Sequence, residues 1–577
     1  MKNLVTLLLL ASLYFIAHTN AEEKVTAKAE QQVQVDICIY GATPAGINAA
    51  IAGQREGKSV LIVEPGRWVG GILGAGISPI QDCSSLDPVG GLTRKQILSL
   101  GRKEAIDPTG ISYKKLHDKN WKVPPQNIRR DYLKILSENR IRVIYNYRVS
   151  HCSKDKGAIV SVGFDLAPFD SLGCPPIQAE KKNSLSVEAR IFIDAGYEGN
   201  LMARAGVSYR KGRESRSEFN EAHAGITELD LVTFLDPFKE KGKPRSGLLN
   251  GVENYGEKSL GDGDDYTQAY NFRYSTTSNP ADRSPIEAPD NYKATDYELV
   301  GRYVSYLVGD RMKTGKSIEK HLENIIPMWD LSTNYRRSSL ITMAPLGISR
   351  LFVDGDYAVQ ARIWKQHQDY LRGLYHFMTT DDRVPEKFRE KLASQGLNKL
   401  HFPDTAGYPH QLYIRCARKL KGRYTVTEND IYNKGKAHSV IAFGLYGVDV
   451  YPVRRVFGKK QDKYFVGVEG WMFVGHQNGP TGEPYPIPYE AITPFEEECS
   501  NLLVPVCFSG THLGYASARM EPVFMILGES AGIAAVQAIN EDSSVQTIDM
   551  KAYGKHLLES GQVLKIPGKI NNMSPNK

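Results

Sequence analysis

The stretch from residue 33 to residue 71 constrains the fold of this chain more than any other. It begins with a short run rich in β-branched residues (33–39), which predicts a buried strand. The chain then breaks at GATPAG (41–46), continues with apolar residues at helical spacing, and reaches a second apolar run that ends at Glu64. This order of strand, tight turn, helix, strand and acid is typical of the unit that binds the ADP half of a dinucleotide.

Each part of this unit has a physical task. Gly41 allows the sharp exit from the strand, and Gly46 allows the helix to pack closely on the sheet. Free N–H groups at the helix start face the pyrophosphate. Glu64, 18 residues after Gly46, is placed to accept hydrogen bonds from the adenosine ribose, and its charge disfavours NADP. Thr43 replaces the middle glycine of G-x-G-x-x-G. An ordinary βαβ turn without a ligand is the alternative.

The first 21 residues have the pattern of a secretory signal peptide. Lys2 precedes an apolar run of about 14 residues (4–17), and small residues follow at 19–21. The run is short compared with the roughly 20 residues of a membrane-spanning helix, although a retained N-terminal anchor is the alternative. The sequence therefore predicts a periplasmic or secreted protein without a stable membrane span.

Charge and cysteine content exclude several kinds of partner. The formal net charge is +7 and no long basic block occurs, so nucleic acid is not an expected partner. Seven cysteines are scattered without a C-x-x-C pair, which excludes a zinc ribbon or a thioredoxin-type redox pair. No metal site is expected. The expected partners are a small-molecule substrate and an electron acceptor that the sequence does not identify.

The first half of the remaining chain has the signals of a sheet with helices. Helices are expected at 96–104 and 127–138, strands at 142–147, 158–164 and 190–193, and a polar loop at 165–186. The last of these strands closes on Asp194-Ala-Gly196 and leads into a helix, so it could return to the first sheet.

The second half changes in character. From about 207 to 484, long polar loops rich in aromatic residues predict an inserted domain, with helices at 364–377 and 386–397. An apolar strand at 501–507 and a small-residue turn follow. The next helix carries small residues at its expected start, near 528–535, where a ligand could approach the backbone closely.

These segments together resemble the FAD-dependent oxidoreductases of the glutathione-reductase-like FAD-binding type, and more narrowly the bacterial FAD-dependent oxidoreductase family, which has exported members. The matching stretches span about 33 to 545: GATPAGINAAIAGQREGKSVLIVEPGRWVGG, IDAGYEGNLMARAGVSY, QAYNFR, LYIRCARKLKGRY, IPYEAITP, NLLVPVCFSGTH and RMEPVFMILGESAG. The resemblance implies an α/β fold: a Rossmann-like FAD-binding domain (parallel sheet with β-meander) plus an inserted α+β substrate domain. The FAD-binding parts would be 33–206 and 485–550, the substrate or cap domain 207–484, and the tail 551–577.

The resemblance also implies which residues hold the FAD. The pyrophosphate is expected at the turn and at the end of the central strand, the ribose at the acid, the adenine at the backbone of residue 149, and the pyrimidine side of the isoalloxazine at the last helix. The implied residues are Gly41, Thr43, Pro44, Ala45, Gly46, Glu64, Arg67, Gly70, Gly71, Val149, Asp194, Gly196, Gly528, Ser530, Ala531 and Gly532. Related flavoproteins often place an acidic residue on the ribityl chain after the closing strand, whereas this chain has Cys507 there.

Hydride transfer to flavin N5 needs a donor C–H bond on the ring face and a base for the departing proton. His512 is the candidate base, because it lies in the small-residue turn after the closing strand. A histidine bonded only to the backbone is the alternative. Arg519 is expected to stabilise negative charge on the reduced flavin or the substrate, or else to form a structural salt bridge. Arg273 and Arg415 are further candidates for binding substrate oxygen atoms.

The sequence therefore predicts an exported FAD-dependent oxidoreductase that oxidises a small polar molecule, such as a sugar or sugar derivative. No second G-x-G-x-x-G unit occurs in the central region, which favours an organic electron donor over a nicotinamide. Two alternatives stay open. One is an FAD-containing isomerase or lyase without net redox change, and the other is a non-catalytic FAD- or glycan-binding protein.

Overall fold

The computed structural model describes the chain in seven segments: residues 31–80, 85–109, 123–314, 317–328, 338–433, 438–474 and 484–566. The predicted signal peptide at 1–21 lies outside the described residues, as do residues 567–577 of the predicted tail.

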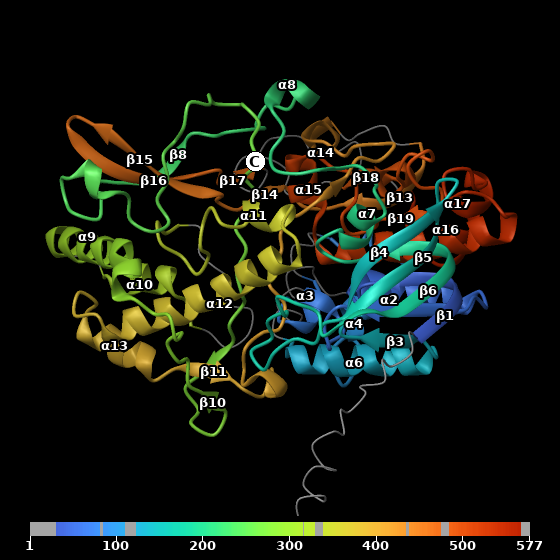
Figure 1. The fold of residues 1–577 in the computed structure, drawn as a ribbon, viewed down its shortest axis with the longest axis horizontal. Helices are drawn as coiled ribbons and strands as arrows, with labels where there is room; N and C mark the ends of the chain where they lie inside the picture. The colour runs from blue at the N-terminus through green and yellow to red at the C-terminus, as the bar shows by residue number, and fades with distance from the viewer. Residues whose placement is uncertain are drawn as a thin grey trace, which may run out of the picture.

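A seven-stranded sheet forms the centre of one half of the molecule (Figure 1). Its parallel strands have the order β3-β2-β1-β6, and β19 also pairs with β6 in parallel. Two antiparallel strands, β5 and β4, extend the sheet beyond β6. The strands are β1 (Gln31–Tyr40), β2 (Val60–Glu64), β3 (Arg142–Tyr145), β4 (Tyr147–Asp155), β5 (Ala158–Leu166), β6 (Lys181–Asp194) and β19 (Leu502–Leu503). The predicted Rossmann-like sheet with a β-meander is confirmed.

Helices α2 (Pro44–Arg55) and α16 (Glu521–Glu541) pack closely against each other beside this sheet. A Cβ atom on Gly528 would lie 2.2 Å from the carbonyl oxygen of Ala45, so only glycine allows this approach. Among the described residues, α16 alone is long and apolar enough to cross a membrane, but 94% of that stretch is buried inside the fold. α16 therefore has the burial of a core helix.

Two elements of the first half differ from expectation. The helix expected at 96–104 is α4 (Gly91–Ser99), and it ends before Gly101, whose φ of 74° is left-handed. The polar loop expected to reach residue 186 is shorter, because β6 already begins at Lys181. Other helices in the described residues of this part of the chain are α3 (Gly71–Gly74), α6 (Pro125–Glu138) and α7 (Asn200–Arg204).

The closing segment also differs from expectation. The strand expected at 501–507 is only β19, because Val504 donates its N–H to Ile492 and Pro505 has no N–H for a sheet ladder. The last long helix begins at Glu521 rather than near 528, with Pro522 in its first turn, a position that suits proline. Helices α15 (His512–Ala518) and α17 (Met550–Glu559) flank α16 along the chain.

Residues between 207 and 484 form most of the other half of the molecule, on the left in Figure 1. We call this part the cap. Its helices are α8 (Arg216–Phe219), α9 (Glu298–Thr314), α10 (Glu319–Ile325), α11 (Arg350–Val353), α12 (Tyr357–Thr380), α13 (Glu386–Ala393) and α14 (Glu428–Asn433). The longest of them, α12, reaches from the cap to the central sheet (Figure 1).

The cap also contains short antiparallel strands in small sheets. These strands are β7 (Tyr209–Arg210), β8 (Leu229–Thr233), β9 (Thr276–Thr277), β10 (Arg283–Ser284), β11 (Gly396–Asn398), β12 (Lys419–Leu420), β13 (Val440–Gly444), β14 (Val448–Val450), β15 (Arg454–Lys460), β16 (Lys463–Glu469) and β17 (Met472–Val474), and β13 pairs with β18 (Tyr485–Pro488). One continuous cluster of buried apolar residues joins the cap to the sheet half. The contact between the two halves is therefore an apolar core rather than a wet interface.

Candidate functional site

The turn between β1 and α2 depends on its two glycines. Gly41 has a φ of 102°, and a Cβ atom there would lie 3.1 Å from the backbone of Ala195. A Cβ atom on Gly46 would lie 2.1 Å from the carbonyl oxygen of Gly41, closer than any real contact. The turn therefore has no room for a side chain at either glycine. Without those side chains, the backbone at the start of α2 stays open to a ligand.

Thr43 gives the departure from G-x-G-x-x-G a structural role. Its hydroxyl accepts a hydrogen bond from the N–H of Gly46 at 3.1 Å and so caps α2. The same hydroxyl donates to the carbonyl oxygen of Ala195 at 2.8 Å, which ties the turn to the end of β6. A threonine here performs two tasks that glycine cannot perform.

Glu64 stands at the end of β2 beside this turn. Its carboxylate accepts hydrogen bonds from the N–H groups of Ala42 at 2.6 Å and Gly66 at 2.7 Å. Burial raises the pKa of Glu64 to about 7, although these two hydrogen bonds oppose the rise. Each carboxylate oxygen can accept more than one hydrogen bond, so the side chain retains capacity for ribose hydroxyl groups.

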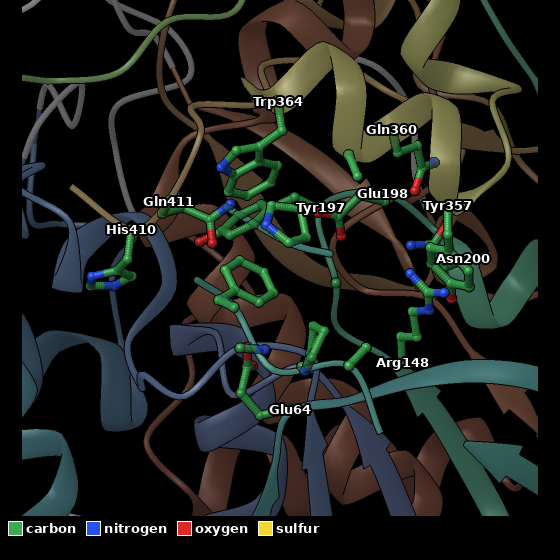
Figure 2. A pocket seen from close by; sticks show the side chains of 18 of the residues that line it. Glu64, Arg148, Tyr197, Glu198, Asn200, Tyr357, Gln360, Trp364, His410 and Gln411 are labelled. Atoms are coloured by element: carbon green, nitrogen blue, oxygen red, sulfur yellow. The ribbon is translucent and has the colours of Figure 1, made fainter. Parts of the chain in front are cut away.

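A cleft opens over the turn and the end of β2 (Figure 2). It encloses about 870 Å³, including its solvent-open part. Glu64 lies on one side, and α12 of the cap supplies Gln360 and Trp364 on the opposite side (Figure 2). Other lining residues are Gly41, Thr43, Gly71, Arg148, Gly196, Tyr197, Asn200, Tyr357 and His410.

The adenine side of the cleft is closed by a contact between the cap and the sheet. Tyr357 of α12 donates its hydroxyl to the carbonyl oxygen of Val149 at 2.8 Å. The guanidinium of Arg148 lies 4.4 Å from the centre of the Tyr357 ring. The expected adenine contact through the Val149 backbone would therefore have to share that carbonyl oxygen with Tyr357.

Arg67 differs from its expected position along the diphosphate. Its guanidinium donates to the carbonyl oxygen of Phe169 at 2.8 Å and lies 4.3 Å from the centre of the Trp68 ring. Trp68 in turn stacks on His410, with ring centres 4.3 Å apart. Arg67 therefore supports an aromatic wall of the cleft from behind instead of lining it.

The structure separates Cys507 and the expected FAD residues of the first part of the domain into two groups. Lining the cleft are Gly41, Thr43, Glu64, Gly71 and Gly196. Behind this lining lie Pro44, Ala45, Gly46, Gly70, Asp194 and Cys507, all buried. Among these, Asp194 accepts hydrogen bonds from Gly196 N–H at 3.1 Å and Met202 N–H at 2.8 Å, so it shapes the turn that faces the cleft.

The expected isoalloxazine contacts on the last helix are not supported by the structure. Because α16 begins at Glu521, the residues Gly528, Ser530, Ala531 and Gly532 lie in its interior rather than at its start. Gly528 and Gly532 face the backbone of α2, and the Ser530 hydroxyl donates to a cap carbonyl, that of Ile441, at 3.3 Å. These small residues serve helix packing, and none of them lines the cleft.

His512 is the first residue of α15, with Thr511 as its cap. The His512 backbone N–H donates to the Glu214 carboxylate at 2.6 Å. Burial lowers the pKa of the imidazole well below its usual range, and the positive charges of Lys419 and Arg213 add to this. The ring is therefore neutral at pH 7 and is a weak proton acceptor. It does not line the cleft.

Arg519 and Arg415, which are far apart in the sequence, meet at Tyr413. Arg519 donates to the Tyr413 hydroxyl at 3.3 Å and to the carbonyl oxygen of Asp449 at 3.0 Å. Its guanidinium also lies 3.8 Å from the Asp449 carboxylate, which is the structural salt bridge given above as the alternative role. The Arg415 guanidinium lies between the rings of Tyr413 and Tyr451, at 4.2 and 3.8 Å from their centres. The third candidate, Arg273, lies 5.9 Å from the Tyr413 ring centre.

Arg415, Arg519 and Tyr413 line a second, narrow cavity together with Tyr197 and Glu521. We call it the inner cavity. Sequence reasoning missed Glu521 and Tyr197. A usable signal was present, because Glu521 is a charged residue at the edge of a long apolar stretch, where a carboxylate is unexpected.

The sheet, the glycine turn and the acid at the end of β2 define a dinucleotide-binding protein of the Rossmann-like class. A model of the family described as "FAD dependent oxidoreductase" matches residues 36–557, which is most of the chain. The chain belongs to this family. It is an FAD-dependent oxidoreductase, and the open start of α2 and the remaining acceptor capacity of Glu64 fit the ADP half of FAD.

Solved structures are similar only in part. The L-proline dehydrogenase from P. horikoshii is 14% identical with a TM-score of 0.16, over 32% of this chain and 25% of that chain. The T. acidophilum thioredoxin reductase is 16% identical with a TM-score of 0.16, over 28% of this chain and 34% of that chain. The 3-ketosteroid-delta4-(5alpha)-dehydrogenase from Rhodococcus jostii RHA1 is 13% identical with a TM-score of 0.19, over 31% of this chain and 50% of that chain. The matches therefore cover half or less of those proteins. No curated protein matches the chain.

Proposed function

We propose that this protein is an exported oxidoreductase that takes a hydride from a small polar organic molecule, such as a sugar or sugar derivative, and passes it to FAD. The observation that carries the proposal is that the cleft and the inner cavity share one wall residue, Tyr197. A cofactor in the cleft would therefore lie next to a cavity lined by charged side chains. Export is proposed from the signal-peptide pattern of residues 1–21.

The chain itself would bind and orient the cofactor. The backbone around Gly41 and Thr43 would face the pyrophosphate, with the dipole of α2 behind it. Glu64 would accept hydrogen bonds from the ribose. FAD, when bound, supplies a ring that accepts two electrons as a hydride. The cap would exclude water from the cleft through Gln360 and Trp364 of α12.

The proposed partners are a small-molecule electron donor and a separate acceptor for the electrons, whose identity is open. Aromatic rings near polar groups in the cap would suit a polyhydroxylated ligand such as a sugar. Most of those rings pack on one another, as Tyr297 does against Tyr370 and Phe377. The sugar part of the proposal is therefore the part that the test below must supply.

Anaerobic titration of the FAD-loaded protein tests the proposed function. The protein is mixed with a panel of sugars, sugar acids, hydroxy acids and amines while flavin absorption is followed. Bleaching by one compound would support hydride transfer and identify the donor class. Product formation without bleaching or an added acceptor would instead indicate an isomerase or lyase. A yellow protein that no compound bleaches or converts would contradict the proposed oxidation.

A further inference from the structure

The inner cavity and the cleft share one lining residue. Tyr197 follows β6 and lines both spaces. Its hydroxyl accepts a hydrogen bond from the N–H of Ile72 at 3.1 Å, and a Cβ atom on Gly71 would lie 2.4 Å from that hydroxyl oxygen. The backbone of α3 therefore fixes Tyr197 at the boundary between the two spaces.

Glu521 lines the inner cavity with a carboxyl group that is only half satisfied. The side chain is buried, with 7% of the residue exposed. One oxygen, Oε1, accepts a hydrogen bond from the Tyr197 hydroxyl at 2.8 Å. The other, Oε2, has no hydrogen-bond partner in the part of the chain that the structure describes. A buried acceptor without a partner is costly, so a function for Oε2 is to be expected.

Two guanidinium groups line the same cavity. Arg415 is held by hydrogen bonds to the carbonyl oxygen of Ala269 at 2.6 Å and to the Asn271 side chain at 2.7 Å. Arg519 is held by Tyr413 and Asp449. Neither arginine forms an ion pair with Glu521 among the described residues. The cavity is therefore lined by two guanidinium groups, of which Arg519 is paired with the Asp449 carboxylate at 3.8 Å, and by a separate carboxyl group.

We propose that the inner cavity binds the carboxylate-bearing end of the substrate, a hydroxy acid, and that Glu521 is the base that accepts the proton of its hydroxyl group. This inference rests on the proposed function and names its substrate class. Arg415 and Arg519 would bind the carboxylate, as guanidinium groups commonly do. The cavity is narrow, so a ligand enters only as its lining side chains move apart.

The proposed step balances in atoms and electrons. The C–H bond on the hydroxyl-bearing carbon would break, and its electron pair would leave with the hydrogen as a hydride, for which FAD, when bound, would supply the acceptor. The O–H bond breaks, its proton passes to Glu521, and its electron pair forms the C=O bond of the product. The alcohol would thereby be oxidised to a carbonyl compound, with the two electrons passing to the cofactor. The proton then leaves Glu521 before the next turnover.

The surroundings of Glu521 suit proton transfer. Burial raises its pKa to about 8, and the Tyr197 hydrogen bond opposes this only in part. The titratable and charged groups that face it are Tyr197 after β6, Tyr132 of α6, and Arg519, Arg415 and Tyr413 around the cavity. A carboxyl group that titrates near neutral pH can both accept and release a proton.

The first test uses the compound that bleaches the FAD-loaded protein. The anaerobic reduction rate is measured from pH 6 to pH 10 for the unmodified protein, Glu521→Gln and Glu529→Gln. Glu529 is a matched control, because it is a second buried glutamate of α16 that bonds Leu92 and Gln562 away from the cavity. We expect the reduction rate of the unmodified protein to rise with pH and to reach a plateau above about pH 8. The reduction rate of E521Q should be at least 100-fold lower and should not rise with pH. E529Q should keep both.

Equal rates for E521Q and E529Q, or an unchanged pH profile in E521Q, would overturn the role of Glu521. Matched donor pairs test the substrate class in the same assay. Lactate and gluconate should bleach more rapidly than their neutral counterparts lactamide and glucose, by at least tenfold for the pair that reacts. Faster bleaching by the neutral member would overturn the hydroxy-acid assignment.

A second measurement needs no turnover. Propionate and propionamide are titrated into the FAD-loaded protein at pH 6.5 and pH 9, and binding is followed by the change in the flavin spectrum and by thermal unfolding. Propionate should bind about tenfold more tightly at pH 6.5 than at pH 9, because Glu521 is ionised at pH 9 and repels it. E521Q should show no such pH effect, and propionamide should not bind. If propionate does not bind, the cavity proposal fails. If it binds as expected but no donor bleaches the flavin, the proposed oxidation fails and the anion-binding cavity stands.

Discussion

The start of α2 lies at the cleft and the start of α16 lies at the inner cavity, and the two starts carry opposite kinds of polar group. α2 has no acid in its first turn and offers backbone N–H groups, capped by Thr43. α16 has Glu521 in its first turn, buried in the inner cavity. A helix N-terminus stabilises a negative charge, yet burial still raises the pKa of Glu521 to about 8. The residue at the helix start, and not the dipole alone, therefore decides whether such a site suits a phosphate group or a protonated carboxyl group.

The largest expected effect comes from adding a methyl group inside the α2 turn. Gly46→Ala would place a Cβ atom 2.1 Å from the Gly41 carbonyl oxygen. We expect the free energy of unfolding to fall by about 3 kcal/mol and FAD binding to be lost. Denaturant unfolding and flavin absorption measure both effects. Gly554→Ala in α17, where a Cβ atom meets nothing within 4 Å, should keep the FAD and the stability. An FAD-loaded G46A protein would contradict the account of the turn.

The second effect concerns the buried carboxyl group of Glu521 at the start of α16. Because folding raises the pKa of Glu521 from 4.5 to about 8, the folded state binds the extra proton and stability falls as the pH rises through this interval. Glu521→Gln removes this penalty, so E521Q should exceed the unmodified FAD-free protein in stability at pH 8 by roughly 2–3 kcal/mol more than at pH 5. Urea unfolding at several pH values gives the difference. A difference that does not depend on pH would mean that Glu521 does not titrate in this range.

The third effect concerns Glu64, whose role would be ribose binding. Glu64→Gln keeps the shape but loses a charged acceptor, a change worth about 2 kcal/mol, or roughly 30-fold in FAD affinity. FAD affinity is measured by fluorescence titration of the cofactor-free protein. Glu559→Gln on the exposed side of α17 is the control and should change nothing. Equal affinities of E64Q and E559Q for FAD would contradict the ribose assignment.

The smallest effect tests the threonine in the glycine motif. Thr43→Ala removes the cap of α2 and the bond to Ala195, and should lower the free energy of unfolding by about 1 kcal/mol. Thr43→Ser keeps the hydroxyl and should restore most of it. If T43S is as unstable as T43A, the methyl group of Thr43 matters more than its hydroxyl.

The α2 side of the centre could be predicted from the sequence because its parts are neighbours along the chain. Gly41, Gly46 and Glu64 lie within one βαβ unit, and the spacing of such a unit is fixed by strand and helix geometry. The return of the strand that ends at Asp194 to the first sheet was also expected, and β6 does pair with β1. Thr43 was noticed as a departure, but its bond to Ala195 spans 152 residues, and no local pattern shows such a contact.

The α16 side could not be predicted in the same way. The inner cavity takes Tyr197, Arg415 and Glu521 from three distant segments, and only the packed fold brings them together. The small residues near 528–535 misled the prediction, because close helix packing and close ligand approach select the same glycines. Proline at the second position of α16 was the better signal for its start.

The absorption spectrum of the purified protein, before and after incubation with FAD and removal of the excess, tests most directly whether this chain binds FAD. We expect flavin bands equivalent to about one FAD per chain, and no flavin bands in Gly46→Ala protein prepared in parallel. A colourless protein that takes up no FAD would contradict the account, because the cleft over the α2 turn would then be a scaffold without its cofactor.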